Sequence, residues 1–519
     1  MRDSLQHTPK APKLAAEREF ATLREFLTKI RYTQAEVGAA LGLTGALDYE
    51  AVRALPARQG KPDSALEVML RLFVLGAPVG GLEIKKHLPR GIPALLEAFG
   101  LLGRSPKQPG KWVALAMLYP LHDIWIASDR WSTPDGSPYR SFPDIVYPAN
   151  ANNTIQFLEW LPATPCETFL ELCAGTGVLA LLAAKHYAKQ AWATDIAPRS
   201  VHFAEFNRRL NGLENVTVKQ GDLFEPVRGM QFDRIASHPP YMPSLKQAEV
   251  YYDGGPDGEL ITGTTIRELH SFLRPGGRLW LQTLGTDRKS ASFEQRIRAW
   301  LDSASEDFHV TVISRRLIAP LDFASSAALR DGGGKEMADQ WKRFFQKSEI
   351  ERLVYGLVVL ERKRQAAAAY TVHRLAGPQT GLAQAEWLMR WEEHAASARG
   401  RADLLEQRPI ASPRAELKVT HKSVEGEMQP AGAELSIDFP FSLECKVPAW
   451  TGYVLAWANG SSTVREIFEE CRQKRFIHAD DTPEQFCRFI AMLVSGGFIT
   501  LEQWAVPPPA PAKKTAAAG

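Results

Sequence analysis

Short apolar segments alternate with segments of helical character along the middle of the chain. Seven of these segments have the length and the apolar, β-prone composition of buried strands. They cover residues 168–172, 190–194, 216–220, 232–236, 278–284, 308–314 and 352–360. Helix-forming segments at 178–187, 198–210 and 293–301 lie between them. The alternation predicts an α/β fold with a doubly wound, seven-stranded sheet.

Residues 15–128 show a different pattern. Helical spacing at 17–30, 32–43, 63–75, 82–88 and 92–99 is followed by two β-prone segments, 111–118 and 122–126, which predict a hairpin. Helices followed by a hairpin are typical of a winged-helix-like recognition domain. No helix in this part is densely basic, so both nucleic-acid binding and docking on a protein remain open.

The remaining boundaries follow from shifts in composition. The α/β domain is expected at 129–364, a helical linker at 365–432, a second small winged-helix-like domain at 433–505, and a disordered Pro- and Ala-rich tail at 506–519. An insertion at 324–350 separates the last two predicted strands. It is either a lid over the substrate or a helical decoration of the surface.

Composition and charge exclude only a few classes of protein. The 519 residues exceed the size of a single core, and 45% are hydrophobic and 23% charged, as in ordinary globular proteins. A net charge of +3 does not indicate a nucleic-acid binder. The five cysteines include no Cys-x-x-Cys pair, so no metal site is expected. With a polar N-terminus and no apolar run of spanning length, the expected location is the cytoplasm, away from membranes.

Candidate chemistry begins at the end of the first predicted strand. The stretch from Glu171 to Gly177 reads Glu-Leu-Cys-Ala-Gly-Thr-Gly and joins that strand to a helix. Such a glycine loop is weak evidence alone, because many tight strand-to-helix turns need two glycines. Asp195 and Asp222 end the next two strands, and Pro239-Pro-Tyr241 follows the fourth. In an open α/β sheet these four positions share the edge at which ligands bind.

The four motifs together resemble those of class I S-adenosylmethionine-dependent methyltransferases. The resemblance implies a methyltransferase sheet with an antiparallel last strand, and S-adenosylmethionine as cofactor. The implied cofactor-binding residues are Glu171, Cys173, Ala174, Gly175, Thr176 and Gly177 for the amino-acid end, Asp195 for the ribose, Asp222 for the adenine amino group, and Ile196 and Leu223 for the adenine faces.

The loop after the fourth strand indicates the acceptor. His238, Pro239, Pro240 and Tyr241 stand where amino- and amide-directed members of the family carry Asn or Asp, then Pro-Pro and an aromatic residue. The prolines lack N–H donors and leave carbonyls to accept bonds from the acceptor nitrogen, while the aromatic ring stacks on a flat acceptor group. His238 departs from the family pattern. Imidazole presents one acceptor nitrogen when neutral and ionises near neutral pH.

A second family feature follows at residues 253–258, Asp-Gly-Gly-Pro-Asp-Gly. It resembles a stretch of release-factor glutamine methyltransferases and is expected to flank the acceptor pocket. The resemblance favours an enzyme that methylates a side-chain amide nitrogen in a protein. One alternative is N-methylation of a base in RNA. Another is a non-catalytic S-adenosylmethionine-binding scaffold, since His238 replaces the usual Asn. The oligomeric state does not follow from the sequence.

Overall fold

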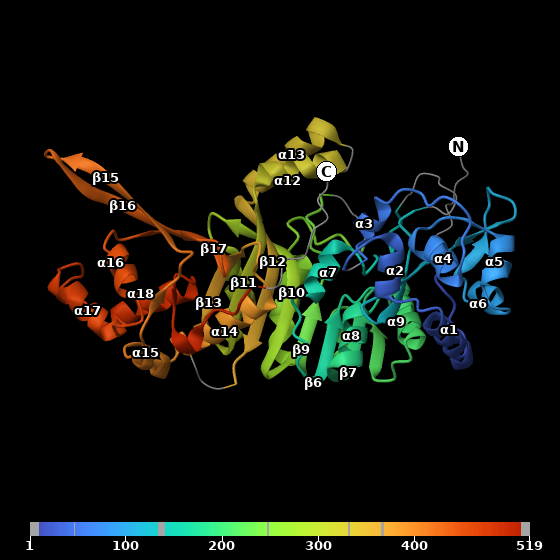
Figure 1. The fold of residues 1–519 in the computed structure, drawn as a ribbon, viewed down its shortest axis with the longest axis horizontal. Coiled ribbons are helices and arrows are strands. Elements are labelled where there is room, and N and C mark those ends of the chain that lie inside the picture. The colour runs from blue at the N-terminus through green and yellow to red at the C-terminus, as the bar shows by residue number, and fades with distance from the viewer. Residues whose placement is uncertain are drawn as a thin grey trace. The chain divides into compact units, whose positions relative to one another are not determined.

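The structure is a computed structural model, and it describes residues 10–45, 47–132, 141–245, 249–330, 333–364 and 368–509. The chain divides into two compact units, Met1–Thr283 and Leu284–Gly519 (Figure 1). The division does not follow the expected boundary at 128/129, because residues 15–128 pack into the same unit as the cofactor motifs. Of the predicted tail at 506–519, residues 510–519 lie outside the described part.

The first unit contains a parallel sheet. Its strands, in spatial order, are β8 (Val216–Gln220), β7 (Ala188–Asp195), β6 (Cys166–Leu172), β9 (Phe232–Ser237) and the start of β10 (Leu273–Arg288). The chain runs outward from β6 through β7 to β8 and then returns to the other side of β6 as β9. The order therefore reverses between β6 and β9, which is the switch point where open α/β sheets bind ligands.

Two helices connect the first three strands. Helix α8 (Val178–His186) packs on β6 and β7, and α9 (Pro198–Leu210) packs on β7 and β8. Pro198 begins α9, where its fixed φ suits the first turn, and Gly212 ends the segment with a positive φ. Helix α7 (Asn152–Leu158) precedes the sheet, and α10 (Leu260–Phe272) leads into β10. The α/β methyltransferase architecture expected from the sequence is present.

The N-terminal part of this unit holds most of the expected helices. They are α1 (Glu17–Lys29), α2 (Gln34–Leu41), α3 (Tyr49–Arg53), α4 (Ala65–Met69, continued by a π-helical turn to Val74), α5 (Gly81–His87) and α6 (Ile92–Ala98). A three-stranded antiparallel sheet joins β1 (Val79–Gly80), β3 (Lys111–Ala114) and β2 (Leu102–Arg104). The helices and this sheet do not by themselves establish a winged-helix domain.

The predicted hairpin of 111–118 with 122–126 is wrong in part. Residues 111–114 belong to the small sheet as β3, while β4 (Met117–Leu121) pairs with β5 (Ile124–Ser128) around a two-residue turn. His122 takes a positive φ in that turn. Both strands of the hairpin are almost wholly buried. Their side chains are therefore apolar on both faces, and no alternation of apolar and polar residues marks where each strand begins or ends.

An aromatic cluster joins this N-terminal part to α9. The rings of Phe20 and Phe99 approach the ring of Phe206 with centroids 5.2 and 5.5 Å apart. All three side chains are fully buried. The N-terminal part therefore shares its core with the helix that follows Asp195.

The second unit contains the last two predicted strands. Strands β11 (Phe308–Ile318) and β12 (Ile350–Arg362) pair antiparallel, as the family resemblance implied. The insertion between them is a pair of helices, α12 (Pro320–Arg330) and α13 (Gly334–Lys347), packed through Phe323, Trp341 and Phe345 (Figure 1). Asp331 and Gly332 lie outside the described residues. Helix α11 (Phe293–Leu301) precedes β11.

The sheet of the second unit extends beyond β11. Strand β13 (Thr371–Ala376) pairs with β11 in parallel, followed by β17 (Phe441–Val447), β16 (Glu427–Ile437) and β15 (Glu416–Val424). The expected count of seven strands is therefore not confirmed. The helical linker predicted at 365–432 is wrong in part: it contains α14 (Leu382–Ala396) and α15 (Ala398–Leu404), but also β13, the short β14 (Ile410–Ala411), β15 and the start of β16.

Three helices follow in the C-terminal module: α16 (Thr451–Trp457), α17 (Val464–Gln473) and α18 (Pro483–Ser495). The capping boxes of Thr463 and Thr482 begin the latter two. After α18 the short strand β18 (Ile499–Thr500) pairs with β14.

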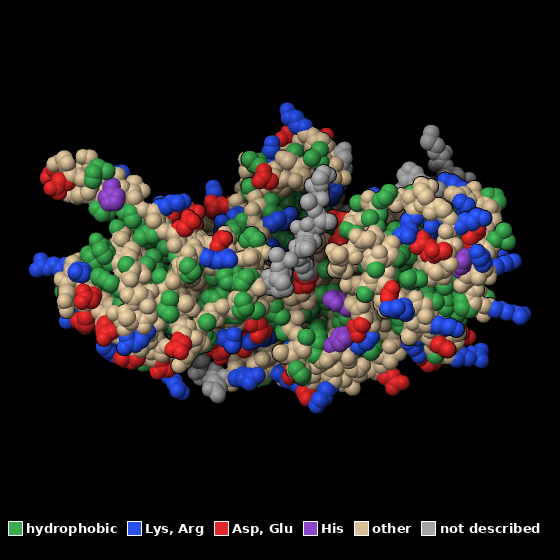
Figure 2. All heavy atoms as spheres, in the orientation of Figure 1, with side chains coloured by type: hydrophobic (Ala, Val, Ile, Leu, Met, Phe, Trp, Pro, Cys, Tyr) green, Lys and Arg blue, Asp and Glu red, His purple; other side chains and the backbone are tan. Residues whose placement is uncertain are grey.

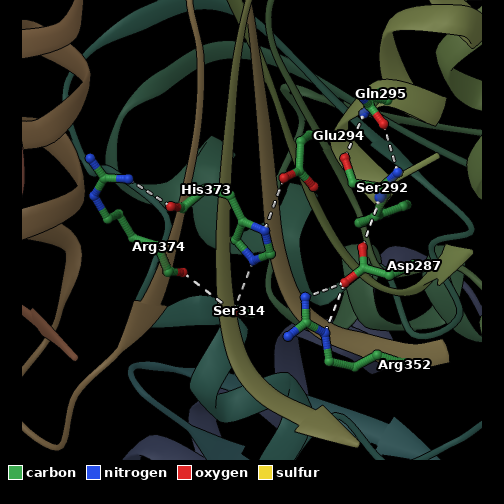
Figure 3. A network of polar contacts seen from close by, with 9 residues as sticks. Asp287, Ser292, Glu294, Gln295, Ser314, Arg352, His373 and Arg374 are labelled. Carbon is green, nitrogen blue, oxygen red and sulfur yellow. Dashed lines mark hydrogen bonds and ion pairs between the residues drawn. The ribbon is translucent and has the colours of Figure 1, made fainter. Parts of the chain in front are cut away.

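A polar network fixes β13 to its neighbours (Figure 3). His373 lies with Nε2 3.0 Å from Oγ of Ser314 on β11, and with Nδ1 3.4 Å from Oε1 of Glu294 on α11. A Ser–His–carboxylate row can be a nucleophile with its base. Here Ser314 is fully buried in the middle of a strand paired on both sides, so its hydroxyl cannot meet a substrate. The network is structural.

Candidate active site

The loop after β6 has the backbone geometry that its sequence predicts. Cys173, Gly175 and Gly177 all have positive φ, of 54°, 52° and 77°. A Cβ on Gly177 would lie 3.1 Å from the Cβ of Ala204 on α9, so only glycine lets the helices approach this closely. A Cβ on Gly175 would meet nothing within 4 Å, which leaves open space beside the loop. Ala174 and Thr176 complete the turn and are buried.

Glu171 is a buried carboxylate beneath this loop. Its Oε2 accepts a hydrogen bond of 2.8 Å from the N–H of Ala180 in the first turn of α8. Burial, together with a smaller contribution from the nearby charge of Asp195, nevertheless raises the pKa of Glu171 to about 8. A buried acid with so high a pKa is suited to a cationic ligand, which would restore its ionised form.

Asp195 ends β7 and binds the glycine loop directly. Its Oδ2 accepts from the N–H of Gly175 at 2.8 Å, and its Oδ1 accepts from the N–H of Ala197 at 2.9 Å. Burial raises the pKa of this carboxyl as well. An ionised carboxylate has about four acceptor positions, so it retains capacity for hydroxyl groups of a ligand.

The predicted adenine residues lie at the ends of β7 and β8. Asp222 is exposed, and the apolar side chain of Ile196 is 54% exposed, although isoleucine is usually buried. Leu223 is buried and takes a positive φ of 42°, and its carbonyl accepts a bond from the Thr194 hydroxyl. The structure thus places Glu171, Asp195 and Asp222 at the ends of three adjacent parallel strands.

The loop expected to hold the acceptor, His238–Tyr241, leaves the end of β9 and is called the acceptor loop below. The ring of His238 stacks on that of Tyr241, with centroids 5.5 Å apart and planes at 15°. Its other neighbour is Phe157 of α7, at 5.7 Å and edge-on. Pro239 is buried and Pro240 is half-buried, so the loop is fixed against the protein.

Residues 253–258 dock on this loop. The N–H of Met242 donates to the carbonyl of Tyr252, and the N–H of Gly254 donates back to the carbonyl of Met242. A Cβ on Gly254 would lie 2.8 Å from the backbone of Tyr241, and one on Gly258 would lie 2.4 Å from its carbonyl oxygen. Glycine is required at both places, because the two loops touch backbone to backbone.

Helix α7 contributes residues that sequence reasoning missed. Asn153 donates from Nδ2 to the hydroxyl of Tyr241 at 3.4 Å, and its carbonyl accepts from Gln282 of β10 at 3.0 Å. Phe157, one turn later, reaches His238. The i, i+4 spacing of an asparagine and an aromatic residue was the available signal, but many helices carry such a pair.

Further aromatic side chains gather beside the two loops. The rings of Tyr147 and Tyr251 stack at 5.2 Å, and the ring of Trp131 stands edge-on to Tyr147 at 4.8 Å. Burial raises the pKa of the Tyr147 hydroxyl to about 12. Tyr251 precedes the residue whose carbonyl binds Met242, so this cluster adjoins the acceptor loop.

Within the described part of the chain, no group of three or more His, Cys, Asp or Glu side chains is placed to hold a metal ion. Among the same residues, no helix is both long enough and apolar enough to cross a membrane.

Known proteins are similar to this part of the chain. The model of the methyltransferase small domain matches residues 152–295. A Methanocaldococcus jannaschii protein, provisionally described as a protein N5-glutamine methyltransferase, is 34% identical over 28% of this chain and 74% of its own length. The release factor glutamine methyltransferase of Moorella thermoacetica is 36% identical over 24% of this chain and 50% of its own. The ribosomal protein uL3 glutamine methyltransferase of Bradyrhizobium diazoefficiens is 32% identical over 28% and 50%.

The fold, the row of acids and the acceptor loop define a class I methyltransferase. The chain belongs to the S-adenosylmethionine-dependent methyltransferases of the small-domain type, as the sequence resemblance implied. It spans about half the length of the release factor and uL3 enzymes that it matches.

The residues present fit the cofactor. S-adenosylmethionine offers an ammonium group, ribose hydroxyls and an adenine amino group, all of them hydrogen-bond donors, and the three strand ends offer carboxylates. The open space beside Gly175 and the raised pKa of Glu171 suit a ligand that brings positive charge. Glu171 and Asp195 would hold the amino-acid end and the ribose, with Asp222 at the adenine.

Proposed function

We propose that this enzyme methylates the side-chain amide nitrogen of a glutamine in a protein. The observation that carries the proposal is the docking of residues 253–258 on the acceptor loop, through Gly254 and Gly258 against Tyr241. The loop at 238–241 was expected from amino- and amide-directed methyltransferases and the stretch 253–258 from release-factor glutamine methyltransferases, and the two are in backbone contact. The names of the relatives support the same acceptor.

The chemistry requires alignment more than activation. S-adenosylmethionine supplies a methyl group on a sulfonium, which is already activated. An amide nitrogen is a weak nucleophile because its lone pair is delocalised into the carbonyl. Carbonyl oxygens of Pro239 and Pro240 would accept its N–H bonds, and the ring of Tyr241 would stack on the amide plane. The nitrogen gives up one proton when it gains the methyl group, and the neutral imidazole of His238 is the proposed acceptor of that proton.

The acceptor loop has His238 where related enzymes carry an asparagine, and Asn153 is proposed to supply the missing amide. It brings an amide to the Tyr241 hydroxyl from the neighbouring helix, while His238 occupies the usual amide position. On this proposal the replacement at residue 238 does not abolish catalysis, in contrast to the scaffold alternative.

The RNA alternative has less support. Figure 2 shows Lys and Arg side chains intermixed with Asp and Glu on the visible face. Among the described residues on that face they form no continuous basic band of the kind that follows a nucleic-acid backbone. The flanking helical parts are proposed to recognise a protein acceptor.

Transfer of label from methyl-tritiated S-adenosylmethionine to a bacterial lysate tests the proposal. Label that protease removes and RNase leaves is expected. Label removed by RNase would establish the RNA alternative, and cofactor binding without transfer would establish the scaffold.

A further inference from the structure

Asn207 of α9 and Asn211, the C-cap residue of that helix, both pair with β5. The N–H of Ala127 donates to Oδ1 of Asn207 at 2.7 Å, and Nδ2 of Asn207 donates to the carbonyl of Ala127 at 3.0 Å. One helical turn later, Asn211 makes the same pair of bonds with Trp125, at 2.9 and 2.8 Å. Four helical residues and two strand residues span nearly the same length, so the two amides continue the ladder of the β4–β5 hairpin.

Only one of the two asparagines also reaches the cofactor loop. Nδ2 of Asn207 donates a second bond, of 3.0 Å, to the carbonyl of Thr176. Asn211 instead donates its second bond to the backbone carbonyl of Asn207, one turn earlier. Thr176 lies between Gly175 and Gly177, so Asn207 holds the middle of the glycine loop.

Asn207 is fully buried, and its environment specifies an amide. Both of its N–H groups face carbonyl oxygens and its oxygen faces an N–H. The loop is thus held from two sides, by Asn207 at the Thr176 carbonyl and by Asp195 at the Gly175 N–H. Each buried partner that loses its bond would be left unsatisfied, which costs more than an average hydrogen bond contributes.

We propose that Asn207 is a positioning residue that couples the N-terminal hairpin to the cofactor site. When β5 is seated on α9, the amide of Asn207 is fixed and so is the Thr176 carbonyl. Because such coupling is reciprocal, a bound cofactor that orders the loop must stabilise the packing of β5 on α9 by the same free energy. Residues 124–128 therefore contribute to cofactor affinity without a catalytic group of their own.

A matched pair of variants separates this coupling from simple loss of packing. Asn207→Ala and Asn211→Ala each remove two bonds to β5, but only the first also releases Thr176. Calorimetry with S-adenosylmethionine is expected to show affinity reduced about tenfold in Asn207→Ala and about twofold or less in Asn211→Ala. Equal affinities in the two variants would overturn the proposal.

Hydrogen exchange of the unmodified protein gives a second test that needs no variant. Adding S-adenosylmethionine should slow exchange at the amide of Ala127, which is bonded to Asn207. The slowing should persist in Asn211→Ala and disappear in Asn207→Ala. Unchanged exchange across residues 124–128 of the parent, with the cofactor bound, would overturn the coupling even if Asn207→Ala failed to fold.

Discussion

At the residue scale, the proposed contact of Glu171 with the cofactor predicts that cofactor binding is linked to the release of a proton. Its pKa of about 8 means that it is mostly protonated at pH 7 in the free protein, and Asp195 is shifted in the same direction. A cationic ligand favours the ionised form, so binding should release a proton and affinity should rise with pH up to about 8. Calorimetry at pH 7 in buffers of different ionisation enthalpy measures the release, which Glu171→Gln should reduce.

The raised pKa of Glu171 also makes the stability of the folded protein depend on pH. Because the folded protein holds this proton more tightly than the unfolded chain, Glu171 destabilises the free protein increasingly as pH rises from about 4.5 to about 8. The cofactor should offset this loss. An absence of proton release, with binding intact, would contradict the assignment of Glu171 to the cofactor site.

Asn153 and His238 allow a rescue experiment. Asn153→Ala should lower methyl transfer into lysate protein about tenfold, while affinity for S-adenosylmethionine stays within about twofold. Adding His238→Asn to that variant returns an amide to the acceptor loop and should recover part of the rate. If Asn153→Ala transfers as fast as the parent, Asn153 has no part in holding the acceptor.

The candidate cofactor residues could be selected from the sequence because the motifs that suggest them are local in sequence. Glu171, Gly175 and Asp195 stand at strand ends, where the pattern itself marks the site. Asn153 and Asn207 were not predictable, because each acts through a partner far along the chain, Tyr241 or Thr176. Asparagine within a helix has no distinctive signal until the tertiary partner is known.

At the scale of elements, the contact between the acceptor loop and residues 253–258 should be the most sensitive to a small substitution. Gly258 has a φ of 82°, and an added Cβ would collide with the Tyr241 carbonyl. Gly258→Ala should displace the acceptor loop and reduce transfer at least about tenfold, with cofactor affinity nearly unchanged.

Gly255→Ala is the matched control for that change. Gly255 has a similar φ of 87° in the same loop, but its added Cβ would meet the Leu260 side chain. Backbone strain alone should therefore affect both variants, and contact with Tyr241 only one. Equal losses in the two would show that the contact with Tyr241 does not matter for transfer.

The ends of elements were least predictable where a strand is buried on both faces, because its sequence then lacks the alternation of apolar and polar residues. The strands of the β4–β5 hairpin are buried on both faces, so no alternation separates β3 from β4. Strand β15 fails for the opposite reason: it is exposed along nearly all of its length and carries too few apolar side chains to be recognised. The alternating strands and helices from 168 to 284 had neither difficulty.

At the scale of the whole molecule, the N-terminal part is expected to be indispensable. Deleting residues 1–128 would expose Phe206 and leave the buried amide of Asn207 without β5. A fragment of residues 129–519 should therefore unfold at lower temperature than the full chain and bind S-adenosylmethionine weakly or not at all. Cofactor affinity equal to that of the full chain would show that residues 15–128 are an independent domain after all.

The central claim is that a glutamine amide in a protein receives the methyl group. The most direct measurement is mass spectrometry of proteins labelled by the enzyme with isotopically marked methyl groups, after protease digestion. The account predicts one added methyl on the side-chain nitrogen of glutamine, lost in Asp195→Ala together with cofactor binding. Methyl groups found only on nucleotides, or on protein residues other than glutamine, would contradict it.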